Sequence, residues 1–174
     1  MQKVNLPICV DPVKSAQKSL KLDCKIAKNL MKRLATSTNS ILADINTQFS
    51  FKIDQQKLRI FHGSSRVAVE ITCQRCNEPM IYQCETKFTY CPVHNIEQEN
   101  NLPDVYEPIF YDKNGEVNLH DIVEDELILS LPQIAKHAIE DCRQSSYELT
   151  FGDLEDEEQQ RLNPFNALAK LKRK

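Results

Sequence analysis

A strict alternation of apolar and polar side chains over residues 45–53 is the feature of this sequence that most restricts its fold. Ile45, Thr47, Phe49, Phe51 and Ile53 fall on one side of an extended chain, because successive side chains of a strand point to opposite faces. Such alternation is typical of an antiparallel strand with one buried face and one hydrated face. The segment therefore predicts a sheet that packs against other elements on one face only.

The strand pattern continues beyond residue 53 and is interrupted by turn-forming residues. Residues 54–56 are expected to form a tight turn, and a second turn is expected at 63–65 because it contains Gly63. The strands predicted between and after these turns cover 58–62, 67–71 and 80–90. The sequence thus predicts a run of antiparallel strands joined by short turns.

Shorter elements are expected on both sides of this run. A helix over 119–131 has apolar residues on one face, Asn118 as a plausible N-cap, and Pro132 at its end. The other short elements are predicted as follows: a strand over 2–10, helices over 13–20 and 25–35, and extended pieces over 105–109 and 116–118. The fold class expected is α+β, with a mainly antiparallel sheet, a few short helices and a basic C-terminal tail helix.

The composition indicates one globular domain followed by a tail. The chain has 174 residues, 41% of them hydrophobic and 27% charged, which is ordinary for a globular protein. We expect a single domain over 1–150 and an acidic linker with a basic amphipathic tail over 151–174. The sequence shows no signal peptide and no apolar stretch long enough to span a bilayer, so a cytoplasmic protein without membrane contact is expected.

The predicted tail helix begins at Asn163-Pro164, an N-cap residue followed by proline. An apolar side formed around Phe165 is combined with a cluster of cations at the end: Lys170, Lys172, Arg173 and Lys174. A helix this short is not stable alone, so we expect it to dock on RNA, on another protein, or on its own domain.

Cys73-Gln74-Arg75-Cys76 lies between two predicted strands and provides half of a tetrahedral metal site. His137 and Cys142 have ligand-like spacing in a predicted loop after Pro132 and are the preferred other half. Thiolate and imidazole donors suit one structural zinc ion. Cys91 and His94 form another pair with ligand-like spacing, and this alternative remains open.

The Cys73–Cys76 pair also has two interpretations without metal. A redox pair would be expected at a helix N-terminus, where the helix dipole lowers a thiol pKa. Two unreactive thiols in a β-turn are the other alternative. The chain has seven cysteines, an odd number, and we expect no disulfide framework.

No pattern in the sequence predicts an enzyme. Glu124, Asp125 and Glu126 are consecutive on the predicted helix and point in different directions, so they cannot converge on one substrate atom. We expect them to form an acidic face toward water or a basic protein partner. With only three glycines, the chain also lacks a Gly-rich phosphate-binding loop.

Several short motifs, spread over the whole chain and in the same order, resemble the bacterial large ribosomal RNA subunit accumulation protein family, also called YceD. They are Met1-Gln-Lys-Val-x-Leu-Pro with Asp11-Pro-Val13, Cys73-Gln-Arg-Cys76, Tyr106-Glu-Pro-Ile109, Val123-Glu-Asp-Glu126 with Leu131-Pro132, His137 with Cys142, and Asn163-Pro-Phe165 through Leu171-Lys-Arg-Lys174.

The resemblance implies a non-enzymatic factor that is needed for the synthesis, processing or stability of 23S ribosomal RNA. Its partners would be a 23S rRNA precursor or large-subunit assembly intermediate, together with a basic ribosomal protein or a nuclease. A second interpretation is a zinc-stabilised adaptor that recruits a nuclease or ribosomal protein without contacting RNA itself.

Overall fold

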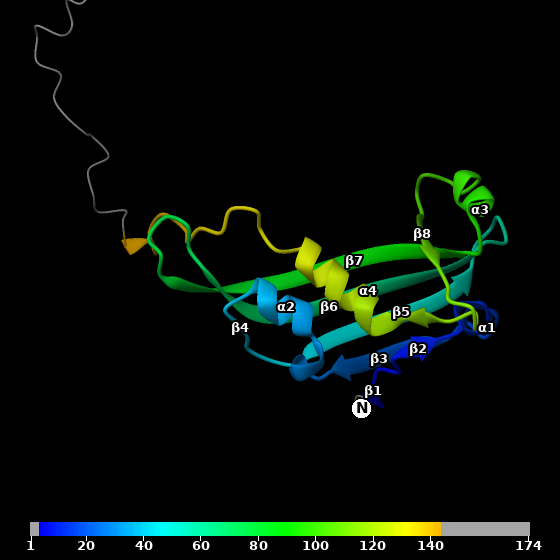
Figure 1. The fold of residues 1–174 in the computed structure, drawn as a ribbon, viewed down its shortest axis with the longest axis horizontal. Coiled ribbons are helices and arrows are strands. Elements are labelled where there is room, and N and C mark those ends of the chain that lie inside the picture. The colour runs from blue at the N-terminus through cyan, green and yellow to red at the C-terminus, as the bar shows by residue number, and fades with distance from the viewer. Residues whose placement is uncertain (1–3, 144–174) are drawn as a thin grey trace, which may run out of the picture. The chain divides into compact units, whose positions relative to one another are not determined.

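The computed structural model describes residues 4–143, and the chain divides into two compact units, residues 1–137 and 138–174. The first unit contains all the helices and strands described below (Figure 1). The main sheet has the strand order β1-β3-β5-β6-β7-β8, and β4 pairs with the far part of β6. Strands β2 and β9 form a separate antiparallel pair.

The sheet is built around two long strands, β6 (Arg59–Thr72) and β7 (Pro79–Val93), which form one antiparallel hairpin. Strand β5 (Ile45–Ile53) pairs with β6, and β3 (Lys21–Ile26) pairs with β5, both antiparallel. The remaining strands are short: β1 (Val4–Asn5), β2 (Cys9–Val10), β4 (Ser40–Ile41), β8 (Glu107–Phe110) and β9 (Val117–Asn118). Strands β1 and β8 pair in parallel at the two edges, so the sheet is mixed but mainly antiparallel, as predicted.

One face of the main sheet carries the core, because alternate residues of β5 and β6 are buried. Five aromatic rings pack there with centroids 5.3–6.2 Å apart: Phe49, Phe51, Phe61, Phe88 and Tyr90. The buried hydroxyl groups of Thr47 and Ser65 are 2.9 Å apart and satisfy each other.

Helices of the described residues 4–143 pack on this apolar face. Helix α1 (Pro12–Gln17) packs on β5 and β6, and its N-cap Asp11 accepts hydrogen bonds from two backbone amides. Helix α4 (Leu119–Leu129) packs on β6 and β7, and α2 (Lys32–Ser37) packs on α4. A 3₁₀ turn, η1 (Lys28–Leu30), precedes α2, and α3 (Ile96–Asn100) follows β7. Asn118 caps α4, as predicted from the sequence.

Three predicted elements differ from the structure. The predicted helix over 25–35 begins in β3, whose residues pair with β5, and only its second half is helical. The strand predicted over 2–10 consists of two short pieces in different sheets. The turn predicted at residues 63–65 is absent, because β6 continues through it without interruption.

The predicted tail over 151–174 lies outside the described residues, and so do its site residues: Phe165, Lys170, Lys172, Arg173 and Lys174. Among the helices of residues 4–143, none is both long and apolar enough to cross a membrane.

Candidate metal centre

The turn between β6 and β7 holds Cys73 and Cys76 close together. The amide of Cys73 donates to the carbonyl of Glu78 at 2.9 Å, and the amide of Asn77 donates back to the carbonyl of Cys73 at 2.9 Å. Asn77 has a φ of 57°, a left-handed conformation that asparagine adopts more readily than most residues. These bonds close a tight turn with both cysteines in it, as the sequence predicts.

The segment after α4 lies against this turn and brings in a histidine from a distant part of the sequence. The amide of Gln74 donates to the carbonyl of Ala135 at 2.8 Å, and its side-chain amide donates to the carbonyl of Gln133 at 3.3 Å. These two bonds fix the segment before His137 beside the turn.

Cys73, Cys76 and His137 offer three ligand atoms that lie within 4.8 Å of one another. The Cys76 Sγ atom is 3.3 Å from His137 Nδ1, and the His137 amide donates to Cys73 Sγ at 3.4 Å. In a tetrahedral zinc site with bonds of about 2.0–2.3 Å, sulfur and nitrogen ligands are about 3.6 Å apart. The Cys76–His137 distance is close to this value, and the upper limit of 4.8 Å leaves all three atoms near enough for one ion.

The environment of Cys73 favours the thiolate, which is the form that binds metal. The side chain is fully buried, and burial alone would raise the pKa of its thiol. Backbone amide groups of Cys76, His137 and Arg75 point at the sulfur and outweigh burial, so the pKa of Cys73 falls to about 5. A negative sulfur is thus held ready at neutral pH by hydrogen-bond donors.

Cys142 belongs to the second unit, where it lies in a short turn. Its amide donates to the carbonyl of Ile139 at 3.4 Å, and the amide of Asp141 donates to the carbonyl of Ala138 at 3.2 Å. These bonds form a turn that begins directly after His137. The chain is continuous between the two residues, which are five positions apart in sequence.

The surroundings of Cys91 and His94 differ from those of the Cys73–Cys76 turn. Cys91 is buried and burial raises the pKa of its thiol, while the ring of His94 stacks on Tyr111 with centroids 5.4 Å apart. The Cys73–Cys76 turn leads into strand β7, so the helix N-terminus that would favour a redox pair does not follow it.

The structure corrects the expectation of an exposed acidic face on α4. Glu124 is only 6% exposed, and its carboxylate accepts bonds from the backbone amides of Arg33 and Leu34 at 2.7 and 3.1 Å. It therefore caps the start of α2, and it also accepts a bond from Arg33 Nε at 3.0 Å. Asp125 is exposed and forms an ion pair with the same guanidinium group.

Glu126 is also buried, at 9% exposure, and faces the sheet rather than solvent. Its carboxylate accepts hydrogen bonds from the hydroxyl groups of Tyr90 at 2.6 Å and Thr86 at 3.0 Å. Burial, together with the bond to Glu126, raises the pKa of Tyr90 above its usual value. Two of the three carboxylates are thus structural, and their partners lie too far away in sequence for local pattern to reveal them.

Comparison with known proteins places these features in a family. The family model described as "Large ribosomal RNA subunit accumulation protein YceD" matches residues 61–172, which include both halves of the predicted metal site. A protein of Haemophilus influenzae with the same name is 45% identical over 174 residues, covering 100% of both chains. No solved structure matches the chain. The profile match over more than half of the chain and the full-length identity show that this protein belongs to the YceD family of large ribosomal RNA subunit accumulation proteins.

Proposed function

We propose that this protein is a non-enzymatic cytoplasmic factor needed for the accumulation of 23S ribosomal RNA, through its synthesis, processing or stability. The observation that carries the proposal is the 45% identity over the full length of a relative named for large ribosomal RNA subunit accumulation. The partners proposed are a 23S precursor or a large-subunit assembly intermediate, with a basic ribosomal protein or a nuclease.

Deletion of the gene and gradient sedimentation test this function together. We expect a lower ratio of 23S to 16S RNA in the deletion strain, restored by the wild-type gene on a plasmid. We also expect the protein to sediment with large-subunit precursors at low salt, because contacts with RNA weaken as salt rises. An unchanged ratio, with the protein always at the top of the gradient, contradicts the proposal.

We further propose that Cys73, Cys76, His137 and Cys142 hold one structural zinc ion. The spacing of the first three ligand atoms and the low thiol pKa support zinc, and Cys142 is the nearest further thiol along the chain. When bound, zinc would supply a cross-link between the β6–β7 turn and the segment after α4.

Metal analysis of the purified protein tests the zinc proposal. We expect one zinc per chain, lost in Cys73→Ser and weakened strongly in Cys142→Ser. Cys84→Ser is a matched control, since Cys84 is an equally buried thiol outside the cluster, and it should retain zinc. If the wild-type protein contains no zinc, the proposed zinc site is wrong. If Cys142→Ser retains all its zinc, only the assignment of Cys142 as the fourth ligand is wrong.

A zinc-stabilised adaptor that recruits a nuclease or ribosomal protein, without touching RNA, is the second candidate. It is favoured by the net charge of −3, because affinity for RNA grows with the number of phosphates neutralised. Crosslinking to RNA in cells separates the two functions. Crosslinks that depend on residues 163–174 support RNA contact by the tail, whereas their complete absence in the intact protein supports the adaptor.

A further inference from the structure

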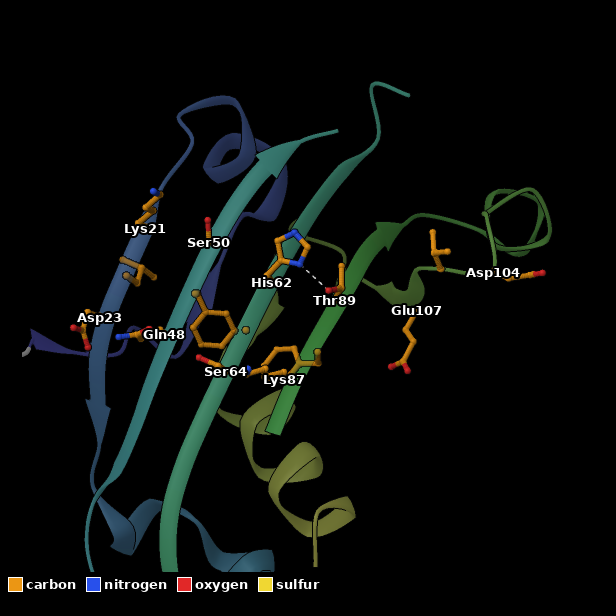
Figure 2. A pocket seen from close by; sticks show the side chains of 15 residues that line it. Lys21, Asp23, Gln48, Ser50, His62, Ser64, Lys87, Thr89, Asp104 and Glu107 are labelled. Carbon is orange, nitrogen blue, oxygen red and sulfur yellow. Dashed lines mark hydrogen bonds between the residues drawn. The ribbon is translucent and has the colours of Figure 1, made fainter. Parts of the chain in front are cut away.

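On the face of the main sheet opposite the helices, polar side chains form three rows where β3, β5, β6 and β7 lie side by side. Figure 2 shows the side chains of this face in front of the strands, with α1 and α4 behind them. Three rows of paired residues cross the four strands: Lys21–Ser50–His62–Thr89, Asp23–Gln48–Ser64–Lys87 and Lys25–Asn46–Arg66–Glu85. None of these side chains is apolar.

This face is also hollowed. A cavity of about 1020 Å³ lies over the first two rows, and residues 104–107 before and within β8 form a wall on one side. Such a volume is at the upper end of the range for small-molecule sites. The hollow is open to solvent, so an extended ligand could lie across it.

His62, in the floor of the hollow, has one unsatisfied nitrogen. Its Nδ1 atom is 2.7 Å from the hydroxyl of Thr89, while its Nε2 atom is buried and has no hydrogen-bond partner. It is the one buried side-chain nitrogen or oxygen atom in this state among the residues that the structure describes. An unsatisfied buried polar atom costs about 1–3 kcal/mol, so a hydrogen bond between a ligand and Nε2 would be favourable. Because the atom is buried, the imidazole must turn toward the hollow to form this bond.

The charge of the three rows differs in sign from that of the whole chain. They contain four cations, Lys21, Lys25, Arg66 and Lys87, and two carboxylates, whereas the chain carries −3. The lining of the hollow itself has two of these cations, Lys21 and Lys87, and three carboxylates, Asp23, Asp104 and Glu107. Arg66 is paired with Glu85 at 2.7 Å. Lys21 and Lys87 have no ion-pair partner within residues 4–143, so both ammonium groups can bind an anionic ligand.

We propose that this face binds single-stranded RNA, with phosphates at Lys21 and Lys87 and an unpaired base at His62 and Gln48. The inference rests on the proposed function in ribosomal RNA accumulation and adds to it a binding surface separate from the tail. Unpaired bases are recognised by hydrogen bonds to their edges and by stacking on flat side chains, including histidine. On this face Gln48 can hydrogen-bond to a base edge and His62 can stack on a base, and the cations Lys21 and Lys87 lie on the same face.

A protein partner fits this face less well. The centre of a protein–protein interface is depleted of charged side chains, whereas the three rows contain six of them. Asp104 and Glu107, on the wall, would keep phosphates on the side of the lysines.

The salt dependence of RNA binding by the full chain tests the proposal. The probe is a short, unstructured, fluorescein-labelled RNA, and binding is followed by fluorescence anisotropy at several salt concentrations. Lys21→Ala and Lys87→Ala should each weaken binding several-fold and reduce the slope of log K against log salt by about 0.7, the value for one phosphate contact on a single strand. Lys32→Ala is the matched control, because Lys32 is exposed on α2 and not on this face.

His62→Gln separates base contact from charge. It should weaken binding without changing the salt slope, because neutral His62 makes no phosphate ion pair. Lys21→Ala and Lys87→Ala change only exposed side chains and should fold normally. The proposal can therefore be tested with them even if His62→Gln lowers stability.

Two outcomes overturn the proposal while leaving the function in 23S accumulation intact. In the first, RNA binds but Lys21→Ala and Lys87→Ala behave like Lys32→Ala, which assigns RNA contact to another surface. In the second, these variants bind RNA normally but no longer sediment with large-subunit precursors, which makes the face a protein-binding surface. The proposed function is tested separately, by the level of 23S RNA in the deletion strain.

Discussion

Glu124 shows how one buried side chain can join two helices. Glu124 belongs to α4, and its carboxylate accepts hydrogen bonds from the backbone amides of Arg33 and Leu34 in the first turn of α2. The guanidinium group of Arg33 neutralises its charge. The first amides of a helix have no partner within the helix, so a carboxylate there is favoured by hydrogen bonding and by the helix dipole. This carboxylate is thus one of the groups that join α2 to α4.

Glu124→Gln should therefore lower the free energy of unfolding by about 2 kcal/mol, since the neutral amide binds the two backbone N–H groups and Arg33 more weakly. Asp125→Asn is the matched control and should cost at most about 0.5 kcal/mol, because this exposed ion pair is screened by water. Urea denaturation measures both values. Equal effects of the two substitutions would contradict the capping role.

His62 gives the stability of the protein a dependence on pH. Burial, with a smaller effect of nearby Lys52, lowers the pKa of His62 in the folded state below its unfolded value of 6.5. Below pH 6.5 the unfolded chain therefore binds more protons than the folded one, and stability falls as pH decreases toward the folded pKa. Well above pH 6.5 the imidazole is neutral in both the folded and the unfolded state, so its titration no longer changes stability.

We expect the loss of stability between pH 7.5 and pH 5 to be smaller in His62→Gln than in the wild type, as measured by urea denaturation at the two pH values. His94→Gln is the control for the replacement of an exposed histidine by glutamine. An identical pH dependence in wild type and His62→Gln would show that other groups cause it.

At the scale of elements, the hairpin of β6 and β7 contains a close contact between Gly63 and Phe88 that could not be predicted from the sequence. The ring of Phe88 lies over Gly63, and a Cβ atom at Gly63 would be 2.1 Å from two of its carbons. The glycine therefore provides room for an aromatic ring across the strand pair, and it does not form the turn that its sequence neighbours suggested.

Gly63→Ala should destabilise the fold by about 1–3 kcal/mol, because the added methyl group forces the ring or a strand to move. Phe88→Leu in the same chain should recover part of this loss, since the smaller side chain leaves room for the methyl group. A double-mutant cycle measured by thermal unfolding tests the coupling. Additive effects would mean that the two residues do not compete for space.

The strands with clear alternation could be predicted from the sequence, and so could α4 with its cap Asn118, because these signals are local. β3 was missed because Ile26 has helical spacing to Leu30 and Leu34, whereas its actual environment comes from pairing with β5. Cys73, Cys76 and His137 could be found by residue type and spacing. The roles of Glu124, Glu126 and His62 could not, because their partners come from distant strands and helices.

At the scale of the whole molecule, the cysteine cluster connects the turn at the end of the hairpin to the segment that leaves α4. Without metal, this connection within the first unit depends on a few hydrogen bonds, notably those of Gln74 to Gln133 and Ala135. Metal that binds only the folded state adds to stability by mass action.

A strong zinc chelator should therefore lower the melting temperature of the wild type by several degrees. The same chelator saturated with zinc is the control for non-specific effects, and Cys73→Ser should melt at the same temperature with and without it. A wild-type melting temperature that does not respond to the free chelator would contradict a structural metal.

The length of the β6–β7 hairpin fixes the distance between the two ends at which a ligand could bind. His62 and Cys73 are eleven positions apart on the same continuous strand and its turn, which corresponds to about 36 Å at the rise of an extended chain. Pairing with β7 along this length makes the hairpin resist bending. A short oligonucleotide can therefore contact only one end of the hairpin. A ligand that contacts both His62 and the Cys73 turn must have two contact points separated by about 36 Å.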